Sequence, residues 1–300
     1  MSTVLRLSEK HAIHPPAWLP ANTMYEVMMG SVAYGVSGDA SDVDVYGFCI
    51  PKKDLVFPHL AGEIPGFGRQ VKRFDVWQEH GVKPDGDERS YDFCIFSIVR
   101  YFHLAMDNNP NMVDSLFVPD NCVLHCSEVG RMVRENRRLF LHKGAYHKFS
   151  GYAYSQLHKV EGKNPEPGSK RAELREKYGT DTKFLYHVAR LCDECDQILT
   201  TGDLDLQRSK EYMKAIRRGE VSEDQVRSWF SERELSLEKA YNESKLPHRP
   251  DETKIKALLL QCLEHHYGSL DKVGYVNPGA AEQALAQIAE IANQFQRDLS

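Results

Sequence analysis

The segment from Gly30 to Gly47, GSVAYGVSGDASDVDVYG, places three aspartates within six residues, Asp39, Asp42 and Asp44. Residues two apart in a strand point to the same side, about 7 Å apart along the chain. The carboxylates of Asp42 and Asp44 would repel each other there unless a cation lay between them. A hard cation such as Mg²⁺ prefers carboxylates combined with phosphate oxygens. The Asp-x-Asp pair therefore predicts a divalent-metal site at the start of a strand.

A small-residue turn precedes this pair and favours a phosphate ligand. Gly30 lets the backbone approach a ligand closely, and Ser31 offers an N–H and a hydroxyl to phosphate. Without this turn, a solvated acidic loop before an edge strand would be the simpler interpretation. With it, a metal that holds a nucleoside triphosphate is favoured. Asp39 lies within the turn, where aspartate is typical of loop shaping or capping rather than metal binding.

The composition limits the class of protein. The formal net charge of −5 argues against a broadly basic nucleic-acid binder, so any polyanion would bind a local patch. Seven scattered cysteines, an odd number, are typical of reduced thiols in the cytoplasm. No stretch is apolar and long enough for a signal peptide or a bilayer span. We therefore expect a cytoplasmic globular protein with no membrane association.

The first half of the chain predicts a small mixed sheet. Val43–Ile50 alternates at the period of a strand, with Val43, Val45 and Cys49 on one face. A second strand is expected at Tyr91–Phe96 and leads directly into a helix that stops at Asn-Asn-Pro.

The second half is mainly helical. The strongest helix signal is Thr180–Gly202, which has a continuous apolar stripe and a terminal glycine. Further helices are expected at Glu128–Leu141, Ser150–Val160, Ser222–Glu243, Asp251–Tyr267 and Pro278–Leu299. The predicted fold class is α+β, with a mixed-sheet domain over residues 1–125. A helical domain over 126–300 is expected to cover the cleft that holds the site.

These motifs resemble a known superfamily. The string GSVAYGVSGDASDVDVYGFCIP is similar to the signature of DNA polymerase β-like nucleotidyltransferases, in the bacterial and phage "predicted nucleotidyltransferase" branch. Three later segments resemble the same branch, namely YDFCIFSIVRYFHLAMDNNPNMVDSLF, TKFLYHVARLCDECDQILTTGDL and AIRRGEVS. The resemblance covers most of residues 24 to 250. Its first motif bears on the chemistry, and the later motifs support the branch.

The resemblance implies a two-metal transfer of a nucleoside monophosphate from an NTP, with two Mg²⁺ ions, or Mn²⁺ in their place. Asp42 and Asp44 match the first two carboxylates of such enzymes. The third carboxylate of the superfamily usually lies on a neighbouring strand. Asp92 is the first choice, because it begins the strand that runs into the next helix. Asp75, in RFDVW, has the same local pattern and is its rival.

A cationic face on the Thr180–Gly202 helix is the second predicted part of the site. Lys183, His187 and Arg190 are spaced i, i+4 and i+7 and therefore share one face. Such a face could hold a triphosphate, or it could be an ordinary solvated basic surface. The resemblance includes these three positions and favours the nucleotide-binding role.

Two further groups remain open. Asp114 matches an acidic position of the family and could either anchor its helix or orient a catalytic group. Tyr152, Tyr154 and His158 form a cluster that helix packing explains more simply than stacking on a base.

Two functional classes follow. The first is an active nucleotidyltransferase that uses an NTP, ATP among the candidates, and modifies an RNA 3′ end such as that of tRNA, a protein hydroxyl or a small molecule. The second is a catalytically idle nucleotide-binding or partner-binding module on the same fold. The intact Asp42, Asp44 and Gly30-Ser31 set favours the first class. The acceptor and the oligomeric state are left open by the sequence.

Overall fold

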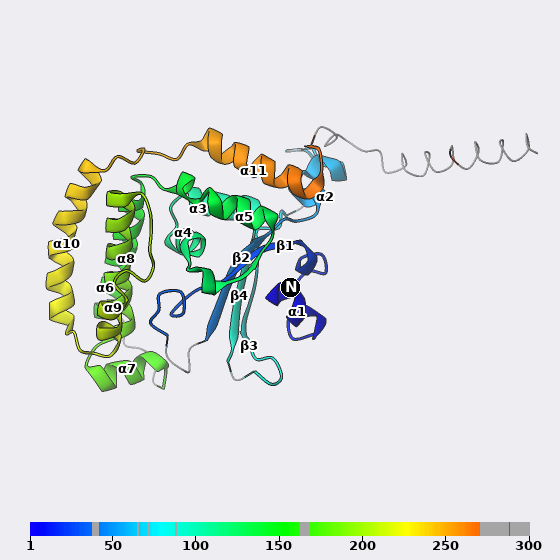
Figure 1. The fold of residues 1–300 in the computed structure, drawn as a ribbon. Helices are drawn as coiled ribbons and strands as arrows, with labels where there is room; N and C mark the ends of the chain where they lie inside the picture. Colours follow the sequence, from blue (N-terminus) through cyan, green and yellow to red (C-terminus); the bar gives the residue numbers. More distant parts are fainter. Residues whose placement is uncertain are drawn as a thin grey trace, which may run out of the picture.

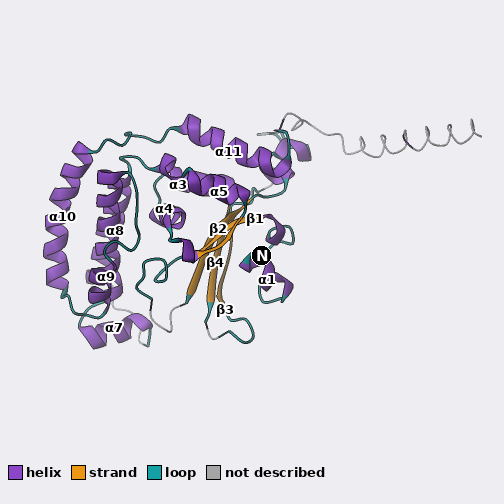
Figure 2. Ribbon diagram, in the orientation of Figure 1, coloured by secondary structure: helices purple, strands orange, loops and turns teal. Residues whose placement is uncertain are grey.

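The computed structural model describes residues 1–37, 42–64, 66–70, 72–87, 89–162, 168–270 and 288. Asp39 lies outside the described residues, and so does the helix expected at Pro278–Leu299, apart from residue 288. Within the described ranges the chain forms a mixed sheet in its first half and a mainly helical region after it (Figures 1 and 2). The predicted α+β class is confirmed.

The sheet has five strands in the order β3-β4-β2-β1-β5. The central pair, β2 and β4, is parallel, and the other neighbouring pairs are antiparallel. The strands are β1 (Thr23–Met28), β2 (Val43–Cys49), β3 (Val76–Val82), β4 (Tyr91–Ser97) and β5 (Val123–Cys126). Because β2 and β4 run in the same direction, their first residues lie at the same end of the sheet.

The two faces of the sheet pack against different layers. Val43, Val45 and Cys49 contact a small core that includes Val4 and Leu7 of α1 (Thr3–Glu9). The opposite face of β2 contributes to the larger core, against the helices. Figure 1 shows α1 on one side of the strands and α4 and α8 on the other. The predicted division of the β2 side chains between two faces is confirmed.

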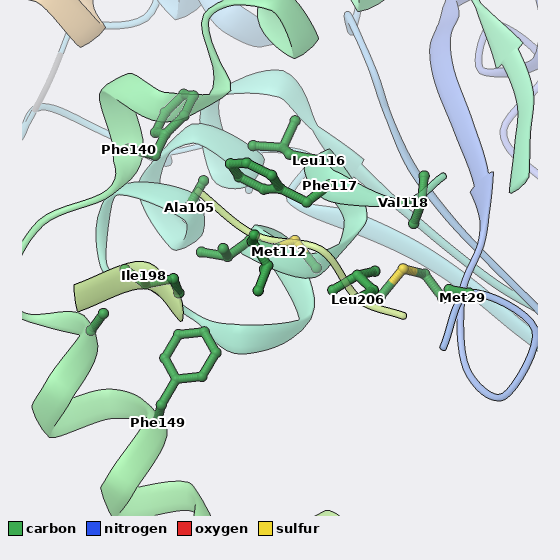
Figure 3. Close-up of a cluster of buried hydrophobic side chains, with 14 of the residues drawn as sticks. Met29, Ala105, Met112, Leu116, Phe117, Val118, Phe140, Phe149, Ile198 and Leu206 are labelled. Carbon is green, nitrogen blue, oxygen red and sulfur yellow. The ribbon is translucent and has the colours of Figure 1, made fainter. Parts of the chain in front are cut away.

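The helices enclose one continuous apolar core. Figure 3 shows Leu116 beside Phe117, and Leu206, from the helical region, beside Met29, which follows β1. The helices are α2 (Lys53–Val56), α3 (Ile98–Met106), α4 (Pro110–Phe117), α5 (Glu128–Glu135), α6 (Ala145–Gly162), α7 (Lys170–Tyr178), α8 (Thr182–Thr201), α9 (Lys210–Arg217), α10 (Glu223–Glu243) and α11 (Glu252–Tyr267). The division of the chain at residue 125 stays a prediction.

One predicted helix is shorter than expected. The helix predicted at Glu128–Leu141 ends at Glu135 and is followed by a separate 3₁₀ turn, Arg137–Phe140. The side chain of Asn136 donates to the Met132 carbonyl at 2.9 Å, which satisfies a carbonyl of the last turn and ends the helix. Among the described residues, no helix combines the length and apolar character needed to cross a bilayer.

Candidate active site

Two aspartates lie side by side where the parallel strands begin. Asp44 of β2 and Asp92 of β4 are direct register partners. Neighbouring strands are about 4.8 Å apart, and partners in register point to the same face. The pKa of Asp44 is raised, chiefly by burial and then by the negative charge of Asp92. The two carboxylates therefore form a site that would gain from a cation.

Polar neighbours hold the carboxylates in place. Asp92 Oδ1 accepts the backbone N–H of Gly81 at 2.7 Å, and His80 Nδ1 lies 3.5 Å from the same oxygen. Asp42 Oδ1 accepts the hydroxyl of Ser90 at 2.6 Å. Asp42 is exposed at the start of the strand, and its charge also raises the pKa of Asp44. The three predicted carboxylates are thus brought to one end of the sheet.

The rival carboxylate, Asp75, lies elsewhere. Its backbone carbonyl accepts the N–H of Ser97, the last residue of β4, whereas Asp92 is near the first. At about 3.3 Å per residue, this places Asp75 some 16 Å along the strand from Asp92. The geometry therefore favours Asp92 over Asp75 as the partner of Asp44.

The Gly30 turn packs directly on Asp44. Gly30 has a φ of +65°, and a Cβ built on it would lie 2.0 Å from Asp44 Oδ2. The N–H of Met29 donates to the carbonyl of Asp44 at 2.7 Å. Only glycine fits this position, because a side chain would both strain the backbone and overlap the carboxylate. The sequence predicted that a ligand could approach the backbone closely at Gly30. In this structure the group that lies close to Gly30 is the Asp44 carboxylate.

The start of α8 supplies a cation to the same site. The positive charge of Lys183 acts to lower the pKa of Asp44, against burial and the other aspartates. Asp181 caps the helix by accepting the N–H groups of Lys183 and Phe184. His187, one turn further along, is partly buried, and its ring centroid is 5.0 Å from that of Tyr186. The helix therefore places Lys183 within electrostatic range of the carboxylates.

Arg190, the third cation of the predicted face, is buried, whereas Lys183 is exposed. It is 7% exposed, and its Nη1 donates to Asp114 Oδ2, Glu194 Oε1 and the hydroxyl of Tyr34, at 2.5, 2.9 and 2.6 Å respectively. The Nη1 group of Arg190 is thus occupied by partners inside the protein. The phosphate contact expected of Arg190 stays a prediction, and what the structure shows for this side chain is a buried pairing with Asp114 and Glu194.

Three residues of this region were not predicted from sequence. Tyr34 and Glu194 complete the buried cluster, and His80 lies beside Asp92. The i, i+4 spacing of Arg190 and Glu194 is a sequence signal for that ion pair. Tyr34 and His80 are brought in only by the tertiary fold.

The aromatic cluster on α6 lies on the surface. Tyr152 and Tyr154 are 46% and 54% exposed, so packing in the core does not explain them. The rings of Tyr154 and His158 are 4.3 Å apart, one turn from each other on the helix.

The donor set suits a metal that arrives with a substrate. Within the described ranges, no group of three His, Cys, Asp or Glu side chains could hold a metal ion by itself. Mg²⁺ is commonly bound through one or two carboxylates together with substrate phosphates. The adjacent Asp44 and Asp92, beside the Gly30-Ser31 turn, fit that mode of binding.

A mixed sheet with paired aspartates after a Gly-Ser turn is the arrangement expected of a nucleotidyltransferase of the DNA polymerase β superfamily. A comparison with protein families agrees: the family model RlaP, described as "RNA repair pathway DNA polymerase beta family", matches residues 3–261. The chain therefore belongs to the RlaP family, and the superfamily resemblance seen in the sequence is confirmed.

Other comparisons add little. Among solved structures, the chain is similar to the nucleotidyltransferase-like protein from Exiguobacterium sibiricum 255-15, at 11% identity and a TM-score of 0.28. The similarity covers 87% of this chain and 71% of that chain. At this score the two folds cannot be equated. No curated protein matches the chain significantly.

Proposed function

We propose that this protein transfers a nucleoside monophosphate from an NTP to an acceptor hydroxyl and releases pyrophosphate, with Mg²⁺ or Mn²⁺ as cofactor. The observation that carries the proposal is the register pairing of Asp44 with Asp92, with Gly30 packed against the Asp44 carboxylate. Two carboxylates placed side by side, with Asp44 partly buried, repel each other in a metal-free protein, and a bound cation turns that repulsion into attraction.

Each part of the site has a role in this proposal. Asp44 and Asp92, joined by Asp42, would hold the metal ions, which stabilise charge on the transferred phosphoryl group when bound. The Gly30-Ser31 turn offers backbone N–H groups and a hydroxyl to the triphosphate. Lys183 would bind the β and γ phosphates that leave as pyrophosphate. His187 would contact a phosphate or orient the acceptor hydroxyl.

An RNA end is the acceptor that we favour. The support for it is the description of the family as part of an RNA repair pathway. The net charge of −5 limits such an RNA to a local contact near its end rather than a long duplex. A protein hydroxyl, a small molecule and an idle nucleotide-binding module are the alternatives.

Labelled nucleotides separate these alternatives. Each NTP, labelled at its α phosphate, is incubated with the protein, Mg²⁺ and either RNA with a free 3′ hydroxyl or a cell protein extract. We expect label on RNA, and its loss when the RNA terminus is oxidised with periodate. Label on protein would identify a protein hydroxyl, and not RNA, as the acceptor. NTP binding without any incorporation would favour the idle module.

Lys183→Ala is expected to weaken NTP binding by roughly tenfold to a hundredfold, and NMP binding far less. Charge-assisted bonds to phosphate contribute about 1.5–3 kcal/mol each, and NMP lacks the β and γ phosphates. Calorimetric titration of both nucleotides into the wild type and the variant measures the difference.

Lys239→Ala is the matched control, because Lys239 is an exposed helical lysine of α10 that pairs only weakly, at 3.9 Å, with Glu243. Its removal changes the net charge equally but should leave both affinities unchanged. If the Lys183 variant weakens NTP and NMP equally and by less than about threefold, Lys183 acts only as a screened surface charge.

A further inference from the structure

The segment after Gly30 is held by the helical region at three points. Gln207 Nε2 donates to the carbonyl of Ala33 at 3.1 Å, and Arg217 Nη1 donates to the carbonyl of Val36 at 3.0 Å. The third point is the side chain of Tyr34, which enters the buried cluster around Arg190. Residues 33 to 36 are thus held from the α8–α9 side.

The hydroxyl of Tyr34 is the centre of the third contact. It donates to Asp114 Oδ2 at 2.6 Å and accepts from Arg190 Nη1 at 2.6 Å. The guanidinium carbon of Arg190 also lies 4.3 Å from the centroid of the Tyr34 ring. Asp114 is fully buried and Tyr34 nearly so, at 0% and 5% exposure. Hydrogen bonds in such a setting are strong and leave the loop little freedom.

The same helix also carries Lys183. Seven residues of α-helix separate Lys183 from Arg190, a rise of about 10 Å. Arg190, two turns along α8, is joined through Tyr34 to the segment that follows Gly30, and Lys183 lies in the first turn of the same helix. One rigid element therefore sets the distance between the cation and the turn.

We propose that Tyr34, Asp114 and Arg190 are positioning residues that hold the Gly30-Ser31 turn at a fixed distance from Lys183 and Asp44, so that all three meet one triphosphate. This rests on the function proposed above. It gives Asp114 and Arg190 a role without direct contact to the nucleotide.

Tyr34→Phe tests the proposal, because it removes the hydroxyl and keeps the ring under Arg190. We expect NTP to bind roughly fivefold to tenfold more weakly, the effect of losing one or two buried hydrogen bonds that order the loop. The KM for NTP should rise by a similar factor, with a smaller change in kcat.

Tyr101→Phe is the matched control. Tyr101 is fully buried in α3, and its hydroxyl lies 2.5 Å from Ser115 Oγ. Ser115 is the neighbour of Asp114 in α4, so this hydrogen bond reaches the same helix as that of Tyr34 but does not involve residues 31–36. It should lower the melting temperature about as much as Tyr34→Phe and leave NTP affinity within twofold. Equal NTP affinities in the two variants would overturn the proposal.

A second measurement needs no nucleotide. Amide hydrogen exchange in residues 31–36 should be faster in Tyr34→Phe than in wild type, and unchanged in Tyr101→Phe. Unchanged exchange in both variants would overturn the proposal even if NTP binds. If exchange is faster in Tyr34→Phe but the wild-type protein binds no NTP, the contact of Tyr34 with the loop stands. The proposed function, and with it the nucleotide part of this inference, is then refuted.

Discussion

Asp44→Asn should reduce nucleotide transfer about a thousandfold and leave the metal-free protein at least as stable as the wild type. Metal-assisted stabilisation of phosphoryl charge contributes several kcal/mol, and about 1.4 kcal/mol corresponds to a tenfold change in rate. The amide keeps the shape of Asp44 but removes the charge that burial and Asp92 disfavour. Transfer assays and thermal melts in EDTA measure the two effects.

The pH dependence of the melts has a definite sign. The pKa of Asp44 is raised in the folded protein, so the folded state binds a proton more tightly than the unfolded state. The contribution of Asp44 to stability is therefore fully present below its unfolded pKa and is lost as the pH rises through the folded pKa. The Asn variant should lack this loss. A large fall in its melting temperature at neutral pH would mean that Asp44 is a structural residue.

Arg190→Ala is expected to destabilise the protein by about 3–5 kcal/mol at neutral pH, because it leaves the carboxyls of Asp114 and Glu194 buried without a counter-charge. Urea unfolding of the variant and the wild type measures the change. Burial already raises the pKa of both carboxyls, and Arg190 opposes that rise. Without Arg190 the pKa of each carboxyl should rise further, so both take up protons more readily and the loss should shrink as the pH falls.

Arg138→Ala is the control for this prediction. Arg138 pairs with Asp203 on the surface, at 65% and 40% side-chain exposure. Exposed pairs of this kind contribute at most about 1 kcal/mol. A loss in Arg190→Ala no larger than in Arg138→Ala, or one that does not vary with pH, would contradict the buried cluster as described.

The sequence was most informative where local chemistry constrains the backbone. The Asp-x-Asp pair, the glycine before it and the alternation of β2 predicted a strand that carries carboxylates on one face, and Asp92 was predicted on the neighbouring strand. These features depend on short-range geometry, namely the two-residue period of a strand and the lack of a Cβ at Gly30.

What the sequence could not give was the depth at which each polar side chain lies. Helical spacing correctly put Lys183 and Arg190 near one face of α8, but that face turns from the exposed Lys183 into the core at Arg190. The difference depends on Asp114 and Tyr34, which are remote in sequence. The opposite difference holds for Tyr152 and Tyr154, for which helix packing was the simpler expectation. Both are exposed, because periodicity alone does not show which face of a helix the rest of the chain covers.

The central claim is that Asp44 and Asp92 together bind the metal–NTP complex and support transfer. The most direct test compares transfer from α-labelled NTP in wild type, Asp92→Asn and Asp75→Asn under identical conditions. Each substitution removes one carboxylate, but only Asp92 is the register partner of Asp44. Asp75 precedes β3 and lies beside Ser97, the last residue of β4, at the other end of that strand from Asp92. We predict that Asp92→Asn loses transfer and that Asp75→Asn retains it. An active Asp92 variant, or an inactive but folded Asp75 variant, would contradict it.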